Sequence, residues 1–399
     1  MKIGRIISIA LIIIVITLTA GYTQEEYIID TVVGSGEVGY NGDGIKAVMA
    51  SLNRPRGVAL DISNRIFIAD TQNNRIRMVD RLGVIYTIAG NGVFGYGGDE
   101  QKAKYASFAF PMGVHVESLK AIPEKGKEFV RVYIADTRNN RIRMVNEYGI
   151  MRTVAGSGRF GYSGDKGPAT KADLAWPASV TLDENGNIYI ADTYNHRIRV
   201  VYNSGTIAGD ANKKIIPNPK KGFIYTLVGT GKEGYGGDGQ LASLANLRYP
   251  WDVFPANGEL YISDAGNHII RKVSKDGIIT TIAGLPGIPG YYGDVLAATE
   301  EKLNTPYGIW SDGKFVYIAD SMNSRVRSVD IANNKISTIA GLGDFGFSGD
   351  GSPAIYAMLS HPVDVFKAPD GNLYICDLIN SRIRVLIPEK KVSSKTGGK

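Results

Sequence analysis

Residues 55–90 read PRGVALDISNRIFIADTQNNRIRMVDRLGVIYTIAG, and this stretch decides the fold. It holds four apolar runs of about five residues each, separated by turn-forming Gly, Asn and Asp. Pro55 precedes the first run, which suits the start of a strand because proline lacks a backbone donor. The stretch therefore predicts an antiparallel meander of four short strands.

The same signals recur in the same order six times along the chain. Each copy starts at a proline, and the six are Pro55, Pro111, Pro177, Pro250, Pro306 and Pro362. Each second strand ends in an aspartate, and these are Asp70, Asp136, Asp192, Asp264, Asp320 and Asp377. One meander cannot bury both of its faces, whereas several stacked around an axis can. The sequence therefore predicts an all-β fold, a six-bladed β-propeller of four-stranded antiparallel blades.

The order of the strands also predicts how the ring closes. Residues Ile29 to Val33 match a fourth strand with no blade ahead of it, and the last copy stops after its third strand, Arg382 to Ile387. Pairing would satisfy a sheet edge that is otherwise exposed. We expect the N-terminal strand to pair with the last blade.

The signatures Tyr-Ile-Ala-Asp, Asn-x-Arg-Ile-Arg and Pro-x-Gly-Val, in this register, resemble NHL repeats from Ile28 to Pro388. With linkers such as Gly161-Tyr162-Ser163-Gly164-Asp165, the chain is similar to exported bacterial NHL-repeat proteins and to the NHL propeller of teneurins. The resemblance implies a six-bladed propeller. The fourth copy departs from the pattern, with Ile269 where the others have Arg.

The first 20 residues predict export. Lys2 and Arg5 precede an aliphatic run from Ile6 to Thr17, and Ala20 is a small residue suited to cleavage. The run is shorter than the roughly 20 residues of a spanning helix, which favours a cleaved signal over an uncleaved anchor. We expect a signal peptide or N-terminal anchor at 1–20, the propeller at 25–388 and a basic disordered tail at 389–399. The body is expected outside the cytoplasm, as a periplasmic, secreted or outward-facing anchored protein.

The net charge limits the classes of binding partner, and the cysteine content limits the covalent structure. The formal charge is +6, but Lys2, Arg5 and the four lysines of the tail supply most of it, so the body is nearly neutral. That balance counts against nucleic acid as a partner. Cys376 is the only cysteine, which excludes an intrachain disulfide. It occupies the slot held by Ala69 in the first copy, so we expect an inert buried filler.

Repetition argues that several motifs are structural. Gly34 to Gly39 matches a dinucleotide fingerprint, but the pattern recurs between copies without a crossover helix, so we expect no cofactor. We expect capping or arginine pairing for the linker aspartates Asp43, Asp99, Asp165, Asp238, Asp294 and Asp350. A calcium role is the alternative. Asp70 and its equivalents are expected to bond the amides of the turn that follows.

The histidines test an enzymatic interpretation. His196 and His268 occupy the turn position that Asn74 and Asn140 hold elsewhere, which leaves only His115 and His361 near the axis. A metal-dependent lyase or hydrolase needs a third ligand, and none stands out. We therefore expect no catalytic residues and no metal site, with this enzyme class as the alternative.

The residues that differ between copies point to a ligand surface. Beside the prolines, where the chain should reach the central axis, lie Trp176, Tyr249, Trp251 and Tyr307, together with Arg56; Trp310 follows on the same strand as Tyr307. Aromatic side chains give large, rigid contact areas. The alternative is packing between blades. Turn tips such as Arg138 and Tyr194 should surround the same opening, and the insertions at 117–129 and 202–222 should lie on the opposite face.

The leading hypothesis is a non-catalytic exported scaffold that binds a protein, peptide or glycan. A fold of this kind serves many functions, so the site must carry the argument. An RNA-binding propeller is a further alternative, against which the export signal and the neutral body count. Contact with a membrane is expected only through an uncleaved N-terminal anchor.

Overall fold

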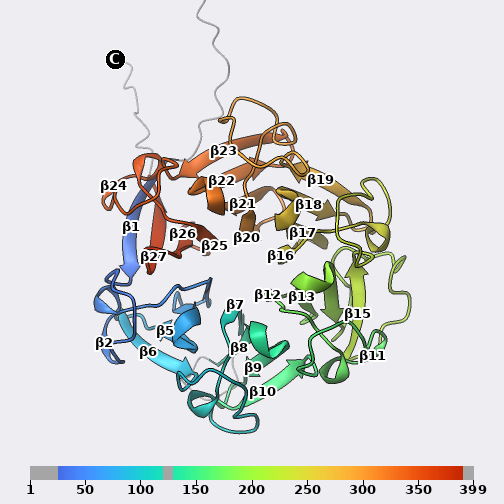
Figure 1. Ribbon diagram of the computed structural model, residues 1–399, viewed down its shortest axis with the longest axis horizontal. Helices are drawn as coiled ribbons and strands as arrows, with labels where there is room; N and C mark the ends of the chain where they lie inside the picture. The colour runs from blue at the N-terminus through green and yellow to red at the C-terminus, as the bar shows by residue number, and fades with distance from the viewer. Residues whose placement is uncertain (1–25, 120–128, 390–399) are drawn as a thin grey trace, which may run out of the picture.

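The computed structural model describes residues 26–119 and 129–389. Six antiparallel sheets surround a central axis as blades, so the predicted six-bladed propeller is confirmed (Figure 1). Residues 1–20, the tail after Glu389 and positions 120–128 of one insertion lie outside the described residues. In the part of the chain that is described, no helix is long and apolar enough to cross a membrane.

Each blade contains four strands that follow one another from the axis to the rim. In blades one to three these are β3 (Gly57–Leu60), β4 (Ile66–Asp70), β5 (Arg75–Val79) and β6 (Val84–Ala89); β7 (Pro111–Ser118), β8 (Val130–Asp136), β9 (Arg141–Val145) and β10 (Met151–Ala155); β12 (Ser179–Leu182), β13 (Ile188–Asp192), β14 (Arg197–Val201) and β15 (Phe223–Val228). In blades four and five they are β16 (Pro250–Ala256), β17 (Glu259–Asp264), β18 (Ile269–Val273) and β19 (Ile279–Ala283); β20 (Pro306–Ser311), β21 (Phe315–Asp320), β22 (Arg325–Asp330) and β23 (Lys335–Ala340). Blade six contains β25 (Pro362–Lys367), β26 (Leu373–Asp377), β27 (Arg382–Pro388) and β1 (Tyr27–Val33).

Short elements complete the repeat. Three blades carry an extra two-residue edge strand, namely β2 (Ile45–Lys46), β11 (Gly167–Pro168) and β24 (Ser352–Pro353). Single 3-10 turns follow the second strands at Thr71–Asn73, Thr137–Asn139, Thr193–Asn195, Ala265–Asn267 and Ser321–Asn323. Further 3-10 turns lie in the linkers at Ala47–Met49, Ala103–Tyr105, Ala169–Lys171, Ala242–Leu244 and Ala354–Tyr356.

The N-terminal strand closes the ring, as expected. β1 pairs antiparallel with β27, with Tyr27 opposite Pro388 and Ile29 opposite Leu386. The two strands lie side by side at one edge of blade six (Figure 1). Ile29 is fully buried in the core between blades five and six. The two ends of the described chain are thus joined by backbone hydrogen bonds that complete the last sheet.

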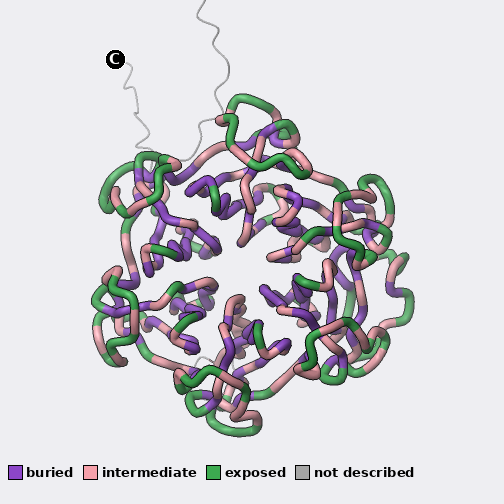
Figure 2. The backbone as a smooth tube through the Cα atoms, viewed as in Figure 1, coloured by how far each residue is buried: buried purple, intermediate pink, exposed green. Residues whose placement is uncertain are grey.

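The hydrophobic core lies between neighbouring blades. The second strand of each blade is the most deeply buried, as in β4, where all five residues are buried. Buried backbone occupies the blade interiors, and exposed residues lie mainly in the loops (Figure 2). Cys376 is fully buried on β26, in the slot predicted for a small filler.

A buried arginine fixes each blade to the linker that precedes it. In blade one, the fully buried Arg77 pairs with Asp70 at 3.5 Å and with the linker carboxylate of Asp43 at 3.1 Å. The same pairs recur for Arg143, Arg199, Arg271, Arg327 and Arg384. The predicted arginine pairing of the linker aspartates is therefore confirmed.

The strand-end aspartates bind different groups from those predicted. Asp70 accepts the backbone N–H of Asn53, which precedes the inner strand, at 2.8 Å. Its second oxygen accepts the Asn73 side-chain amide at 2.8 Å. The turn contact is therefore to a side chain and not to a backbone amide, because Asp70 reaches across to the neighbouring strand instead of curling over its own turn.

The first arginine of the third strand stacks on the linker tyrosine. The guanidinium carbon of Arg75 lies 3.9 Å from the centre of the Tyr40 ring, and its Nη2 donates to Asn91 O at 3.1 Å. A Cβ on Gly92 would lie 2.3 Å from Arg75 Nη1, so a side chain here would displace the guanidinium, and the positive φ of 88° also favours glycine. In blade four, Ile269 takes the place of this arginine. A Cβ built on Gly287, in the linker that follows blade four, would have no atom within 4 Å.

Candidate functional site

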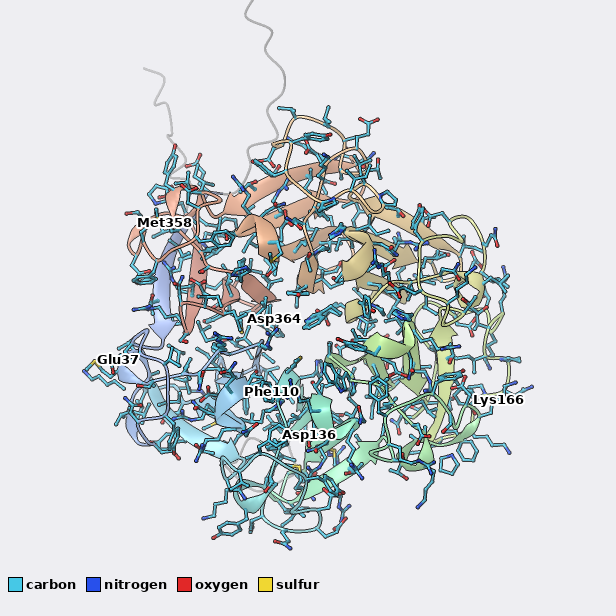
Figure 3. All side chains as sticks on the ribbon, viewed as in Figure 1. Glu37, Phe110, Asp136, Lys166, Met358 and Asp364 are labelled. Carbon is cyan, nitrogen blue, oxygen red and sulfur yellow. The ribbon has the colours of Figure 1, made fainter. Side chains whose placement is uncertain are left out.

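The residue before each inner-strand proline adopts a left-handed backbone. These six residues form what we call the mouth ring, and they are Arg54, Phe110, Trp176, Tyr249, Thr305 and His361, with φ between 46° and 53°. Such values are uncommon outside glycine and persist where the surroundings enforce them. Phe110 lies near the centre of the propeller, whereas Glu37 and Lys166 lie at its rim (Figure 3). The shared conformation means that the backbone presents six unlike side chains in the same way.

A side chain of the preceding blade binds the backbone of four mouth-ring residues. Asn74 Oδ1 accepts the N–H of Phe110 at 3.1 Å, and Asn140 Oδ1 accepts that of Trp176 at 3.0 Å. In the next two blades a histidine does the same: His196 Nδ1 accepts from Tyr249 at 3.2 Å. His268 Nδ1 accepts from Thr305 at 3.0 Å. The predicted equivalence of these histidines with Asn74 and Asn140 is thus seen as a shared hydrogen bond between blades.

The residues that follow the prolines form the centre of the mouth. Arg56 belongs to blade one and Trp251 to the opposite blade four, and the guanidinium carbon lies 5.9 Å from the indole centroid. Tyr307 packs on Trp251 with ring centroids 4.2 Å apart and planes inclined by 33°. Burial lowers the pKa of Arg56. Nearby Tyr307 acts in the opposite direction and raises this pKa, whereas the like charge of Arg54 lowers it further. Burial likewise raises the pKa of Tyr307. Three of the predicted site residues therefore meet at the axis.

A second aromatic cluster lies on blades three and four. Tyr194, at the tip of the turn after β13, bridges Trp176 and Tyr249, with centroid distances of 4.8 and 5.2 Å. All of these contacts are edge-to-face. Arg138 lies over Phe110 and Trp176, 4.3 and 5.4 Å from the ring centres. The structure thus brings Trp176 and Tyr249 together through turn residues that were expected around the mouth.

Trp310 lies apart from the mouth. Its ring packs on Phe254 at 5.7 Å and on Tyr317 at 6.0 Å. It is three residues beyond Tyr307, which is about 10 Å along an extended strand. Trp310 lines the same axial cavity as Arg56 and Trp251, but its ring packs on Phe254 and Tyr317 and not on the other candidate aromatic residues.

A small cavity lies on the axis below the mouth. Its volume is about 50 Å³, and inner-strand residues of all six blades line it. That space admits a few water molecules but no organic ligand. Two buried carboxylates face it: Asp252 accepts the N–H of Ile309, and Asp364 accepts that of Val58, both at 2.8 Å. Burial raises the pKa of Asp252 to about 6, and burial together with Asp252 raises that of Asp364 well above its usual range.

The two axial histidines do not meet. His115 lies deep along β7, where Thr181 Oγ1 is 3.3 Å from its Nδ1 and burial lowers its pKa to about 4. His361 lies in the mouth ring, stacked 4.9 Å from Phe345. Within residues 26–119 and 129–389, no three His, Cys, Asp or Glu side chains form a cluster that could hold a metal ion.

The linker tips are functional candidates that the sequence analysis did not identify. The residue before the Gly-Tyr or Gly-Phe pair is an exposed apolar side chain in four linkers, and these are Val38, Phe94, Phe160 and Phe345. Three of them contact the mouth ring, since Phe345 also stacks on His361. Phe94 packs on Phe110, and Phe160 packs on Trp176. The signal was an apolar residue repeated at one position of a glycine-rich linker. Because an exposed loop needs no apolar side chain for folding, this repetition is itself an indication of a binding surface.

Family comparisons agree with the repeat. Residues 30–95 match the teneurin NHL domain family, and residues 174–201 match the NHL repeat family. NHL repeat-containing protein 2 of Gallus gallus is 28% identical over 392 residues, covering 90% of this chain and 50% of that protein. Teneurin-1 of Gallus gallus is 29% identical over 260 residues, covering 59% of this chain and 9% of that protein. The chain therefore spans about half the length of the first relative and much less of the second.

A solved structure shares the fold. An auxiliary nutrient binding protein from Bacteroides ovatus superposes with a TM-score of 0.60 at 15% identity, covering 92% of this chain and 78% of that one. At this identity the similarity concerns the architecture alone.

Proposed function

The chain is a six-bladed β-propeller of NHL repeats, and from this premise we propose that it is a non-catalytic scaffold that binds a protein, peptide or glycan at its mouth. One observation carries the proposal. The frame residues are the same in nearly every blade, whereas the mouth ring and its neighbours differ and gather aromatic and basic side chains. Aromatic residues and arginine are the types that dominate binding energy in recognition surfaces.

The size of the axial cavity supports binding at the surface. Since the space below Arg56 and Trp251 is about 50 Å³, a ligand of ordinary size stays above these residues. The exposed linker tips Phe94, Phe160 and Phe345 enlarge the apolar surface available to it. Such exposed apolar side chains around a polar centre are typical of interaction sites.

We further propose that the scaffold acts outside the cytoplasm. Support comes from the basic and aliphatic segment at 1–20, which has the composition of an export signal. In this proposal residues 25–388 form the exported propeller and residues 389–399 a basic tail. Detection of the mature N-terminus by mass spectrometry in an extracytoplasmic fraction tests it, and an intact chain in the cytoplasm contradicts it.

Two matched tyrosine variants test the binding function. Tyr249→Ala removes a ring from the mouth cluster, whereas Tyr148→Ala removes a ring that is 65% exposed in the turn between β9 and β10, at the opposite end of the blade. A displayed random peptide library and a glycan array are applied to the full-length protein. We expect the selected ligands to lose affinity for the Tyr249 variant and to keep it for the Tyr148 variant.

Two results would contradict the proposal. One is the same affinity of every selected ligand for wild type and Tyr249→Ala, or a larger loss for Tyr148→Ala. The other is about one tightly bound transition metal per chain in elemental analysis of tag-free protein, which would favour the lyase or hydrolase alternative.

A further inference from the structure

Arg56 differs from the other deeply placed arginines of the propeller. Arg77 and its five equivalents each meet two carboxylates. The Arg56 guanidinium makes neither an ion pair nor a side-chain hydrogen bond with any described residue, and its neighbours are the Trp251 ring, Tyr307 and the like charge of Arg54. A partly buried cation without a counter-charge is costly, so the folded protein offers a site that an anion would complete.

A second polar group beside Arg56 also lacks a partner. The Tyr307 hydroxyl forms no hydrogen bond within the described chain, while its ring packs on Trp251. Guanidinium and phenol are both donors, and a carboxylate accepts several such bonds at once. Both donors lie beside the Trp251 ring, and Tyr307 is close enough to Arg56 to affect its pKa.

The one acid at a linker tip, Glu233, already has a partner, since it pairs with Arg248 at 2.9 Å. Among the mouth ring, the residues after the prolines and the turn tips, the charged side chains are Arg54, Arg56 and Arg138. The next carboxylates along the axis are Asp252 and Asp364, which accept hydrogen bonds from the backbone N–H groups of Ile309 and Val58. The small cavity keeps an incoming group at the height of Arg56.

We propose that the mouth receives a carboxylate of an acidic peptide segment, bound by the Arg56 guanidinium and the Tyr307 hydroxyl beside Trp251. The inference rests on the proposed binding function and names the chemistry of its ligand. Arg54 adds a second positive charge at the entrance.

The surroundings favour a peptide over an acidic glycan. Sugars are held on open, flat ring faces, but Trp251 carries Tyr307 against it and Arg56 near it. Trp176 and Tyr249 meet Tyr194 edge-to-face. The exposed linker tips Phe94, Phe160 and Phe345 provide scattered apolar contacts around a basic centre. Aromatic side chains with arginine and few acids match the composition of protein-binding surfaces.

Peptide selection on variant proteins tests the proposal. A random displayed library is selected in parallel on full-length wild type, Arg56→Gln, Arg56→Lys and, as a matched control, Arg152→Gln. Arg152 is a half-exposed arginine on β10 that pairs with Glu100, away from the mouth. We expect wild type and the control to enrich Asp and Glu flanked by apolar residues. Arg56→Gln should lose that enrichment while still selecting apolar peptides, and Arg56→Lys should retain part of it, because lysine keeps the charge but not the forked donors.

Binding constants of the enriched acidic peptides complete the test. We expect Arg56→Gln to weaken them roughly tenfold, as for the loss of a charge-assisted hydrogen bond, and to leave their Gln-for-Glu counterparts unchanged. Circular dichroism melting of each variant separates loss of the site from loss of the fold.

The outcomes distinguish the inference from the function on which it rests. Selected peptides without acidic enrichment, or acidic peptides that bind Arg56→Gln as well as wild type, overturn the carboxylate site while the mouth remains a binding surface. Arg56-dependent binding of polygalacturonate without acidic peptides in the selected pool overturns the peptide assignment. Failure to select any mouth-dependent ligand overturns the proposed function itself.

Discussion

His196 Nδ1 accepts the backbone N–H of Tyr249 across the boundary between blades three and four, at a distance of 3.2 Å. An imidazole nitrogen can accept only while it carries no proton, so this bond requires a neutral ring. His268 repeats the arrangement with Thr305 in the next pair of blades. Two of the four interblade contacts of this kind at the mouth therefore depend on protonation, whereas those made by Asn74 and Asn140 do not.

Stability should fall in acid because of these two histidines. Burial lowers the pKa of His196 and of His268 below the usual value of about 6.5, so the unfolded chain binds protons first as the pH falls. The two histidines contribute fully to the free energy of unfolding above pH 6.5, and this contribution is lost as the pH falls below that value. Thermal unfolding between pH 7.5 and 5 should show a smaller decline for His196→Asn/His268→Asn than for wild type. Parallel curves for the two proteins would contradict the assignment.

Ring closure predicts that one strand stabilises the whole molecule. Ile29→Ala removes a fully buried side chain from β1, and we expect a loss of about 2–5 kcal/mol in the free energy of unfolding. Asp30→Ala, at the exposed neighbouring position, should change it by no more than about 0.5 kcal/mol. Urea unfolding followed by far-UV circular dichroism measures both. Equal stability of the two variants would mean that β1 contributes little to closure.

Two glycines with similar backbones should respond differently to alanine. Gly92 and Gly287 both have positive φ, 88° and 72°, so alanine costs each about 1–2 kcal/mol. Only at Gly92 would the new Cβ meet Arg75, which must then leave its stack on Tyr40. We expect Gly92→Ala to be less stable by roughly a further 0.5–1 kcal/mol in denaturant titrations. A larger loss for Gly287→Ala would refute the packing argument.

The single thiol should be unreactive in the native protein. Cys376 is fully buried, and burial together with Asp364 and Asp377 raises its thiol pKa well above the usual value. Ellman's reagent should therefore react only at the rate of global opening, and promptly in guanidinium chloride. Fast reaction of the folded protein would show that β26 opens on its own.

The sequence predicted the frame well because the frame is repeated. Six prolines fixed the inner strands, and the unpaired first strand revealed how the ring closes. The mouth was only partly predictable, since its contacts join residues far apart in the chain: Arg56 meets Trp251 from the opposite blade, and Tyr194 joins Trp176 to Tyr249. Trp310 was grouped with them because it shares a strand with Tyr307, but strand length places it at another depth.

The left-handed backbone of the mouth ring separates conformation from side-chain identity. Arg, Phe, Trp, Tyr, Thr and His all adopt φ values within 7° of one another there, which spans every shape class from a branched hydroxyl to an indole. A substitution at Thr305 or Phe110 should consequently alter what the propeller presents without altering how it is presented. The six positions are therefore structurally equivalent, and exchanging their side chains one blade at a time should change the binding specificity while the backbone stays the same.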